Sequence, residues 1–405
     1  MTTVYFRVDA NSDIATGHIM RCLSIARACV QAGREHTQRV QISFLTSDSE
    51  SRSLLEDRFE KLNEFPIHCL NSDYRHMETE VSDLLAYITA EADSDISLTS
   101  DTACEKPWLF VDSYFVSPNY FHMLSGHCKI AYLDDLRKLD CPVDLLINYD
   151  TELDCPCYAR AAHKLLGIRY TPLRTQFQSP AYQVRPEAAH VFVSTGGTDP
   201  YGIAEYLLRT IYDCKPCLNT QTVNNTCLSE YPDMSRLQSL HYHIVTSRAN
   251  PRYVNLTDMA ADNPHIHIYE NVTDMATLMA SCDLAVSAGG TTLSELCAVG
   301  VPAISYLMAD NQRTAVESFA VKGIIPFAGD IRPAQKHDFA DQDFESVKIG
   351  TTKEIPSVSV INNILQFMTN MSENMEMRQK SSHEMRALLD GCGARRIADA
   401  LLAPS

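Results

Sequence analysis

Short apolar runs alternate with amphipathic segments along the first part of the chain. The run VYFRVDA at 4–10 is rich in β-branched and aromatic residues, which favours a strand. Apolar residues then recur at helical spacing from Ile19 to Val30, and Gly33 is expected to end this helix at 19–33. Further strands are expected at 40–46, 108–114, 129–135 and 144–150, and a further helix at 77–92.

A second series of the same kind begins near residue 190. The segment HVFVSTGGTDP (190–200) runs from a strand into a Gly-rich turn, and 203–214 is helical. The alternation continues with strands at 242–248, 265–272, 283–290 and 302–308 and helices at 273–282 and 291–300. Two successive β-α series predict an α/β protein with two doubly wound, Rossmann-like domains that face each other.

The predicted domain boundary lies in a linker near 176–189. We expect an N-terminal domain at 1–178 and a C-terminal domain at 186–405, which would include the mostly helical end of the chain. Three polar stretches are expected to be loops or insertions, at 92–107, 215–238 and 329–356.

Composition narrows the class of partner. A formal net charge of −17 argues against nucleic acid and against anionic membrane surfaces. The N-terminus has no leader pattern and no stretch approaches 18 apolar residues, so we expect no membrane span and a cytoplasmic protein. The 14 cysteines are then expected to be reduced, and the pair Cys214 and Cys217, with no second pair nearby, argues weakly for metal or redox chemistry.

The segment SAGGTTLSELCAVGVPAISYLMADNQ (287–312) places two glycines between a strand and a helix. The free N–H groups and positive dipole of that helix start favour an anion such as phosphate, which Gly289 and Gly290 allow close to the backbone. Glu295 follows Thr292 by three residues and is expected to accept hydrogen bonds from a ribose at the same opening. The alternative is that this pair forms only a capping box. The polar residues Asp310, Asn311 and Gln312, which end the next strand, favour ligand binding over a capping box alone.

The segment STGGTDP (194–200) repeats this geometry with Gly196 and Gly197. The alternative is tight packing of the strand against its helix. The spacing fits neither a Walker motif nor the dinucleotide GxGxxG, so an ATPase or a dehydrogenase is disfavoured.

His18 lies between the first strand and the first helix, at the N-terminal end of that helix. The helix dipole there disfavours imidazolium, so we expect a neutral ring near pH 7 that acts as a general base. Asp9 is placed to orient the ring, and Arg21 is placed to offset negative charge on a leaving group. The alternative, which the residues alone leave open, is that His18 only caps the helix.

Three segments together resemble a known family: FRVDANSDIATGHIMRCLSIA (6–26), the stretch 271–312 that ends in ADNQ, and LLDGCGARRIADALL (388–402). They are similar to the UDP-2,4-diacetamido-2,4,6-trideoxy-β-L-altropyranose hydrolases of pseudaminic acid biosynthesis. These hydrolases belong to the GT-B group, which includes the MurG-type glycosyltransferases. The segments 112–114, 132–135 and 167–177 resemble the family as well.

The resemblance implies a GT-B fold with a central cleft and hydrolysis of a UDP-linked 2,4-diacetamido-2,4,6-trideoxyhexose to UDP and free sugar. His18 would activate a water that attacks C1 with inversion, with no metal and no cofactor. The diphosphate would lie near Gly289 to Thr292, and the ribose near Glu295. The substrate-binding or UDP-binding residues predicted in this way are Gly17, Arg21, Arg174, Gly196, Gly197, Gly289, Gly290, Thr291, Thr292, Glu295, Asp310, Asn311 and Gln312.

Two departures leave the exact sugar open: Ala15 replaces the family's glycine two residues before the GH, and the insertions lengthen the chain. The alternative is a GT-B glycosyltransferase of the MurG-like or spore-coat type. A transferase with a lipid acceptor should carry an apolar, basic patch within 1–150, which the sequence does not show. A module that only binds nucleotide sugars is disfavoured by the presence of His18. We expect a UDP-sugar as the partner and a monomeric protein.

Overall fold

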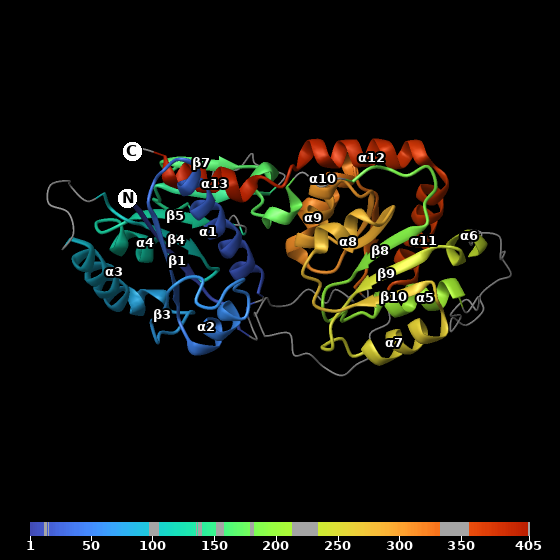
Figure 1. Cartoon of the computed structure of the whole chain (residues 1–405), viewed down its shortest axis with the longest axis horizontal. Coiled ribbons are helices and arrows are strands. Elements are labelled where there is room, and N and C mark those ends of the chain that lie inside the picture. Colours follow the sequence, from blue (N-terminus) through green and yellow to red (C-terminus); the bar gives the residue numbers. More distant parts are fainter. Residues whose placement is uncertain are drawn as a thin grey trace, which may run out of the picture. The chain divides into compact units, whose positions relative to one another are not determined.

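The computed structural model describes most of the chain as two compact units (Figure 1). The first unit consists of Met1–Gln178 and Leu389–Ser405, and the second of Ser179–Leu388. The described residues are 1–11, 14, 16–96, 105–134, 136, 140–150, 158–178, 182–212, 234–332 and 356–403. Ala15, the cysteine pair at 214 and 217, and most of the expected insertions lie outside them.

In the described part of the first unit, a seven-stranded sheet has the order β3-β2-β1-β4-β5-β6-β7 (Figure 1). All of its neighbours pair in parallel. The strands are β1 (Thr2–Val8), β2 (Val40–Thr46), β3 (Ile67–Cys69), β4 (Trp108–Asp112), β5 (Lys129–Leu133), β6 (Leu145–Asn148) and β7 (His163–Leu166). Because the chain leaves β1 toward β2 and later returns on the other side to form β4, the topological switch point lies between β1 and β4.

Two apolar cores lie on opposite faces of this sheet. Alternate β1 residues serve each face: Phe6 joins the core that contains α1 (Gly17–Glu35), and Tyr5 joins the core that contains α3 (Val81–Ile96) and α4 (Pro118–Leu124). The other helical elements within the described part of the unit are η1 (Met77–Glu80), α2 (Ser49–Glu56), η3 (Ile168–Tyr170), η4 (Thr175–Phe177) and α13 (Gly393–Leu402). Because successive side chains of a strand point to opposite faces, this alternation also decides which polar side chains reach which face of the sheet.

The first helix has the apolar stripe that the sequence predicts, but a different end. Ile19 and Leu23 are fully buried, whereas the helix continues through Gly33 to Glu35. A Cβ atom at Gly33 would lie 2.4 Å from Val40 Cγ2. The glycine therefore allows the start of β2 to approach the helix, and the prediction that it ends the helix is wrong.

The C-terminal helix belongs to the first unit. Ile397, Ala398 and Leu401 of α13 share a core with Ile19 and Leu23 of α1. The prediction assigned all terminal helices to the second domain, and for α13 the grouping of Leu389–Ser405 with the first unit corrects it. The sequence predicted helices at the end of the chain, but helical periodicity does not tell which core a helix covers.

In the described part of the second unit, a six-stranded sheet has the order β10-β9-β8-β11-β12-β13, again with parallel pairs. The strands are β8 (His190–Ser194), β9 (His241–Val245), β10 (Ile266–Tyr269), β11 (Leu284–Ala288), β12 (Ala303–Leu307) and β13 (Phe327–Asp330). The switch point lies between β8 and β11. The strand β13 was not predicted, because its run is short and adjoins a polar stretch.

The helices of the second unit are α5 (Ile203–Tyr212), α6 (Met234–Gln238), α7 (Tyr253–Asp262), α8 (Met275–Ala280), α9 (Thr291–Val299), η5 (Asp310–Gln312), α10 (Arg313–Val321), α11 (Val358–Glu373) and α12 (Met375–Leu388). One face of the sheet packs Val191, Tyr242 and Ile244 against apolar residues of α5, α7 and α11. The predicted α/β class with two doubly wound, Rossmann-like domains is confirmed.

Candidate functional site

The first unit holds an acid–imidazole pair at its switch point. His18 is the second residue of α1 and Asp112 is the last residue of β4, and their side chains are almost completely buried. Val8, at the end of β1, is in register with Asp112. The Nδ1 atom of His18 lies 2.7 Å from Asp112 Oδ1. The β1–β4 pairing therefore brings together two residues 94 positions apart in the chain.

The charge of Asp112 decides the tautomer of His18. Burial favours the neutral carboxyl, but the Arg21 guanidinium and the His18 ring outweigh it and hold the pKa of Asp112 well below its usual range. A carboxylate only accepts hydrogen bonds, so the 2.7 Å contact with Asp112 requires a proton on Nδ1 of His18. Arg21 Nη2, a donor that lies 2.9 Å from the same Nδ1, then donates to Asp112 Oδ1 and not to the ring. The second ring nitrogen, Nε2, then keeps its lone pair. A neutral imidazole in this tautomer is suited to act as a general base.

Arg21 supports the carboxylate from the next turn of α1. Its Nε and Nη2 atoms donate to Asp112 Oδ2 and Oδ1, each over 2.5 Å. Its Nη1 atom donates to the hydroxyl of Tyr149 over 2.7 Å. Arg21 was predicted to offset charge on a leaving group. The structure gives its guanidinium a direct role in keeping Asp112 ionised, and its role at a leaving group stays a prediction.

Asp9 does not orient His18 as predicted. Its Oδ2 atom accepts from Arg7 Nη1 over 2.5 Å, and its Oδ1 atom accepts from the backbone N–H of Ser47 over 2.7 Å. Arg7 in turn donates through Nε and Nη2 to Glu80 over 2.7 and 2.8 Å. Arg7 and Asp9 are two residues apart and so face the side of the sheet opposite Val8. Strand alternation therefore separates Asp9 from the α1 face.

Tyr114 and Tyr149 complete the surroundings of the pair and were not predicted as site residues. The Tyr114 ring lies edge-on to the His18 ring at a centroid distance of 4.5 Å, and Tyr114 is 40% exposed. The sequence carried one usable signal: within the predicted strand at 108–114, the apolar run WLFV is followed directly by an aspartate, Asp112. Assigning that aspartate to His18 required knowing that β1 and β4 are neighbours.

Two further predicted residues of the first unit are Gly17 and Arg174. Gly17 is the first residue of α1, and a Cβ atom there would meet nothing within 4 Å. Arg174 precedes η4, and its guanidinium lies 5.1 Å from the centre of the Phe177 ring. Their assignment to substrate binding stays a prediction.

In the second unit, Gly289 and Gly290 form the turn between β11 and α9 as expected. Gly290 is the N-cap of α9, so Thr291 and Thr292 are the first helical residues. A capping box led by Thr292 is therefore ruled out, because the cap lies two residues earlier. Glu295 is 9% exposed in the second turn of α9. Its predicted role at a ribose stays open to experiment.

The remaining predicted residues of the second unit follow β8 and β12, the two strands that flank β11. Gly196 has φ of +77°, which favours glycine, and the carbonyl of Gly197 accepts from Ser247 Oγ over 2.7 Å. Asn311 lies in η5, and Gln312 Oε1 accepts from the backbone N–H of Met308 over 3.1 Å. Asp310 accepts from Arg332 Nη2 over 2.8 Å. The neighbouring strands β8, β11 and β12 thus end in the Gly196–Gly197 turn, the Gly289–Gly290 turn and η5.

The adjacent glycines of the β11–α9 turn are expected to respond differently to alanine. A Cβ atom at Gly289 would lie 2.3 Å from Val316 Cγ1, whereas at Gly290 the nearest atom is Gln312 Nε2 at 3.7 Å. Gly289→Ala should lower the stability of the second unit by about 1–3 kcal/mol through overpacking. Gly290→Ala should fold normally and bind UDP more weakly, because the methyl group fills the predicted phosphate position. Calorimetric unfolding and UDP titration of both variants measure this, and equal stabilities would contradict the packing argument.

Comparison with known proteins connects this geometry to a family of domains. Residues 190–323 match the glycosyltransferase family 28 C-terminal domain, a span that contains every predicted nucleotide-binding residue of the second unit. The chain is 24% identical over 159 residues to the spore coat polysaccharide biosynthesis protein SpsG of Bacillus subtilis. It is 32% identical over 108 residues to the UDP-N-acetylglucosamine–N-acetylmuramyl-(pentapeptide) pyrophosphoryl-undecaprenol N-acetylglucosamine transferase of an Exiguobacterium species. These matches cover 39% and 25% of this chain, and only 41% and 29% of the relatives.

Solved structures extend the likeness to the whole chain. MurG of Acinetobacter baumannii superimposes with a TM-score of 0.59 at 12% identity, covering 99% of both chains. UGT89C1 of Arabidopsis thaliana gives 0.56 at 8% identity, with the same coverage. UDP-GlcNAc 2-epimerase of Neisseria meningitidis gives 0.50 at 11% identity, also covering 99% of both chains. The chain has the GT-B fold. At these identities the likeness concerns the fold alone.

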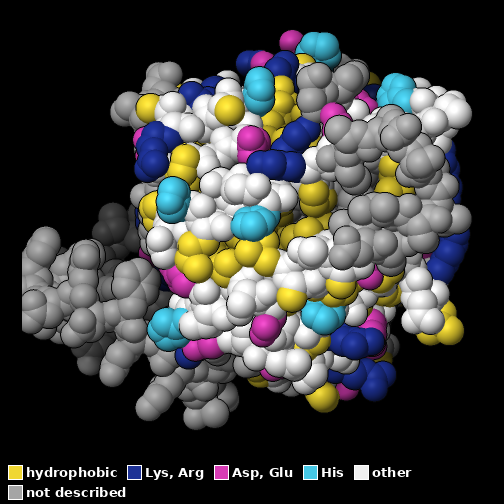
Figure 2. All heavy atoms as spheres, turned by 90° about the vertical axis from the view of Figure 1, so that its left-hand side faces the viewer, with side chains coloured by type: hydrophobic (Ala, Val, Ile, Leu, Met, Phe, Trp, Pro, Cys, Tyr) yellow, Lys and Arg dark blue, Asp and Glu magenta, His cyan; other side chains and the backbone are white. Residues whose placement is uncertain are grey.

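Two further observations on the described residues concern membrane-spanning helices and metal sites. Among the residues that the structure describes, no helix is both long and apolar enough to cross a membrane. Within the same residues, no group of three or more His, Cys, Asp and Glu side chains is arranged to hold a metal ion. On the face shown in Figure 2, hydrophobic side chains are interspersed with basic, acidic and histidine side chains.

Proposed function

We propose that this GT-B protein is an enzyme that transfers a glycosyl group from a UDP-sugar to an acceptor hydroxyl. The observation that carries the proposal is the family 28 match over 190–323, because it spans the turns predicted to hold the nucleotide. The buried His18–Asp112 pair of the first unit supplies the base that such a reaction needs.

The donor is inferred to be a UDP-linked sugar. The Exiguobacterium relative carries UDP-N-acetylglucosamine in its name. The start of α9, with Gly290 as its cap, offers backbone N–H groups and a positive dipole end to a diphosphate. An N-acetylated sugar on UDP is therefore the first donor class to test.

In the proposed step, the Nε2 lone pair of His18 removes the proton of the acceptor hydroxyl as its oxygen bonds to C1 of the sugar. The bond between C1 and the diphosphate oxygen breaks, and UDP leaves with the electron pair. Attack opposite to the leaving group inverts the configuration at C1. The Asp112 carboxylate stabilises the imidazolium that forms, as in other carboxylate–imidazole pairs.

Hydrolysis is the second candidate, with water as the acceptor. The segment that contains GHIMRC favours it, since this segment resembles the pseudaminic acid hydrolases and provides His18 itself. In both candidates, His18 removes a proton from the oxygen that attacks C1. The candidates differ only in whether that oxygen belongs to an acceptor hydroxyl or to water.

One experiment separates the two candidates. Purified protein is incubated with a panel of UDP-sugars, with and without candidate sugar acceptors, and UDP release and the sugar product are followed by NMR. Transfer predicts UDP release that depends on an acceptor and yields a glycoside. Hydrolysis predicts release in buffer alone and a free sugar of inverted anomeric configuration. No release of UDP from any donor would contradict both.

Glu295→Ala is expected to weaken UDP binding by about tenfold, because the variant loses one charged hydrogen-bond acceptor for the ribose hydroxyls. Isothermal titration with UDP measures the change. Glu317→Ala is the control, since Glu317 lies on the exposed side of α10 and pairs with Arg313. Equal affinities of wild type and Glu295→Ala would remove Glu295 from the site.

A further inference from the structure

Histidine side chains gather on one face of the second sheet, far along the strands from the glycine turns. We call this set the histidine face; it consists of His190, His241, His243, His265 and His267. His190 is in register with His241 across β8 and β9, and His243 is in register with His267 across β9 and β10. Because side chains two residues apart share a face, the repeats HYH and HIH stack their imidazoles side by side.

Hydrogen bonds between rings join the strands across this face. His190 Nδ1 lies 2.9 Å from His243 Nε2, and His241 Nδ1 lies 3.2 Å from His267 Nε2. Each such bond needs one ring nitrogen with a proton and one with a lone pair. A doubly protonated imidazole has no acceptor. Two protonated partners therefore lose their bond and repel each other.

The rings are also stacked closely enough for their charges to interact. His241 and His265 are parallel within 12° at a centroid distance of 4.4 Å, and His243 and His267 within 20° at 4.9 Å. Burial and then the neighbouring rings His267 and His190 lower the pKa of His243 to about 4. The pKa values of His241 and His267 are lowered for the same reasons.

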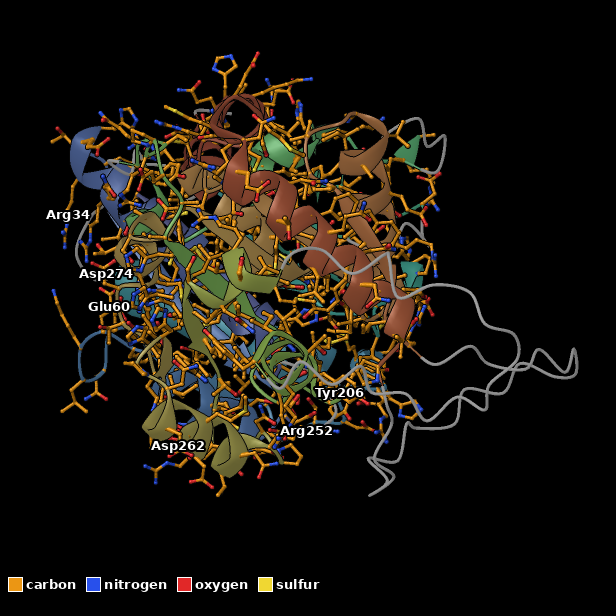
Figure 3. All side chains as sticks on the ribbon, turned by 90° about the vertical axis from the view of Figure 1, so that its right-hand side faces the viewer. Arg34, Glu60, Tyr206, Arg252, Asp262 and Asp274 are labelled. Atoms are coloured by element: carbon orange, nitrogen blue, oxygen red, sulfur yellow. The ribbon has the colours of Figure 1, made fainter. Side chains whose placement is uncertain are left out.

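Within the described part of the chain, few other ionisable side chains lie close to the histidine face. Asp283 raises the pKa of His243 slightly, but its carboxylate is engaged by Arg185 over 2.8 Å. Tyr269 and Cys282 are the other titratable neighbours, and burial raises the pKa of each. The helix α8 carries no ionisable side chain, and its exposed cap Asp274, labelled in Figure 3, hydrogen-bonds to Thr277. Among the residues that the structure describes, Asp283 is thus the carboxylate that acts on the pKa of His243, and Arg185 already offsets its charge.

We propose that the histidine face is a proton-sensitive element, which holds β9 and β10 onto β8 while its rings are neutral and loosens them when the rings are protonated. The rings of His241, His243 and His267 bind protons less readily in the folded than in the unfolded chain, so the stability they contribute is complete above about pH 6.5 and falls as the pH drops toward 4. His243 alone makes opening about 30-fold more favourable at pH 5 than at pH 8.

Loosening of β9 is expected to affect the predicted nucleotide site through Ser247. Ser247 follows β9 and donates to the carbonyl of Gly197 through both its N–H, over 3.2 Å, and its Oγ, over 2.7 Å. Displacement of β9 therefore disturbs the turn after β8. This consequence rests on the proposed function, whereas the opening of the strands does not.

Hydrogen–deuterium exchange of the full chain without nucleotide, at pH 8 and pH 5, tests the proposal. After correction for intrinsic exchange rates, peptides covering β9 and β10 should lose about 30-fold protection or more at pH 5. Strands of the first sheet should keep theirs. His243→Gln removes one titrating ring and should shrink the acid effect several-fold. His163→Gln, at an exposed histidine of β7, should leave it unchanged.

Two outcomes of the exchange experiment would overturn the proposal. One is equal protection of β9 and β10 at both pH values. The other is an acid loss that is identical in His243→Gln. If His243→Gln already lowers protection at pH 8, His267→Gln on the edge strand β10 serves in its place. In wild type, ring proton NMR should show histidines with midpoints well below 6.5, and midpoints all near 6.5 would also contradict the proposal.

Discussion

His18→Ala is expected to lower kcat for release of UDP from its sugar by roughly 10²–10⁴-fold, because it removes the proposed base. UDP affinity should stay unchanged, since the nucleotide is predicted to bind the second unit. Steady-state kinetics with the best donor from the UDP-sugar panel and calorimetric titration with UDP measure the two quantities. A large fall in kcat with constant UDP affinity is what distinguishes a base from a binding residue.

His163→Ala is the matched control for this prediction. His163 lies on β7 of the same unit and is exposed, so its loss should change neither kcat nor affinity. The proposal of His18 as the base would be abandoned if His18→Ala kept wild-type turnover. A loss of UDP affinity in this variant would instead make His18 a binding residue.

Asp112→Asn is expected to lower kcat by roughly 10²–10⁴-fold although Asp112 does not act on substrate itself. An asparagine amide can donate to Nδ1, which favours the wrong ring tautomer and removes the lone pair from Nε2. Nitrogen NMR of the His18 ring reports this directly. Wild type should show the proton on Nδ1, and the variant should show a population with the proton on Nε2. A purely structural role for Asp112 would leave the tautomer unchanged.

The same variant should also be less stable, for a separate reason. Removal of the carboxylate leaves the largely buried Arg21 guanidinium without its counter-charge, at a loss of about 3–5 kcal/mol. The double variant Arg21→Gln with Asp112→Asn removes both charges and should recover part of that stability without recovering kcat. Recovery of kcat together with stability would show that the fall in turnover was only a folding defect.

Particular residues show how far sequence reasoning reached at the candidate site. The position of His18 at the start of a helix, and the turns at Gly196 and Gly289, followed from local order and were placed correctly. The partner of His18 was assigned to Asp9 because that residue is near in the chain. The true partner, Asp112, is 94 residues away and comes close only because β1 pairs with β4.

In the fold and in the histidine face as well, local features followed from the sequence, whereas contacts between distant segments did not. Strand and helix alternation predicted two doubly wound domains, but could not tell that α13 covers the first core or that Gly33 lies inside a helix. The repeats HYH and HIH indicated only that alternate strand positions are histidines. Register across three strands decides that these rings meet.

By itself, the amino-acid sequence determined most of the strands, the α/β class and the turns that present helix starts, because periodicity, glycines and caps act over a few residues. Only the tertiary structure decided which carboxylate faces His18, which core receives the last helix and which histidines stack. Those contacts depend on strand order and register, which arise from packing between segments far apart in the chain.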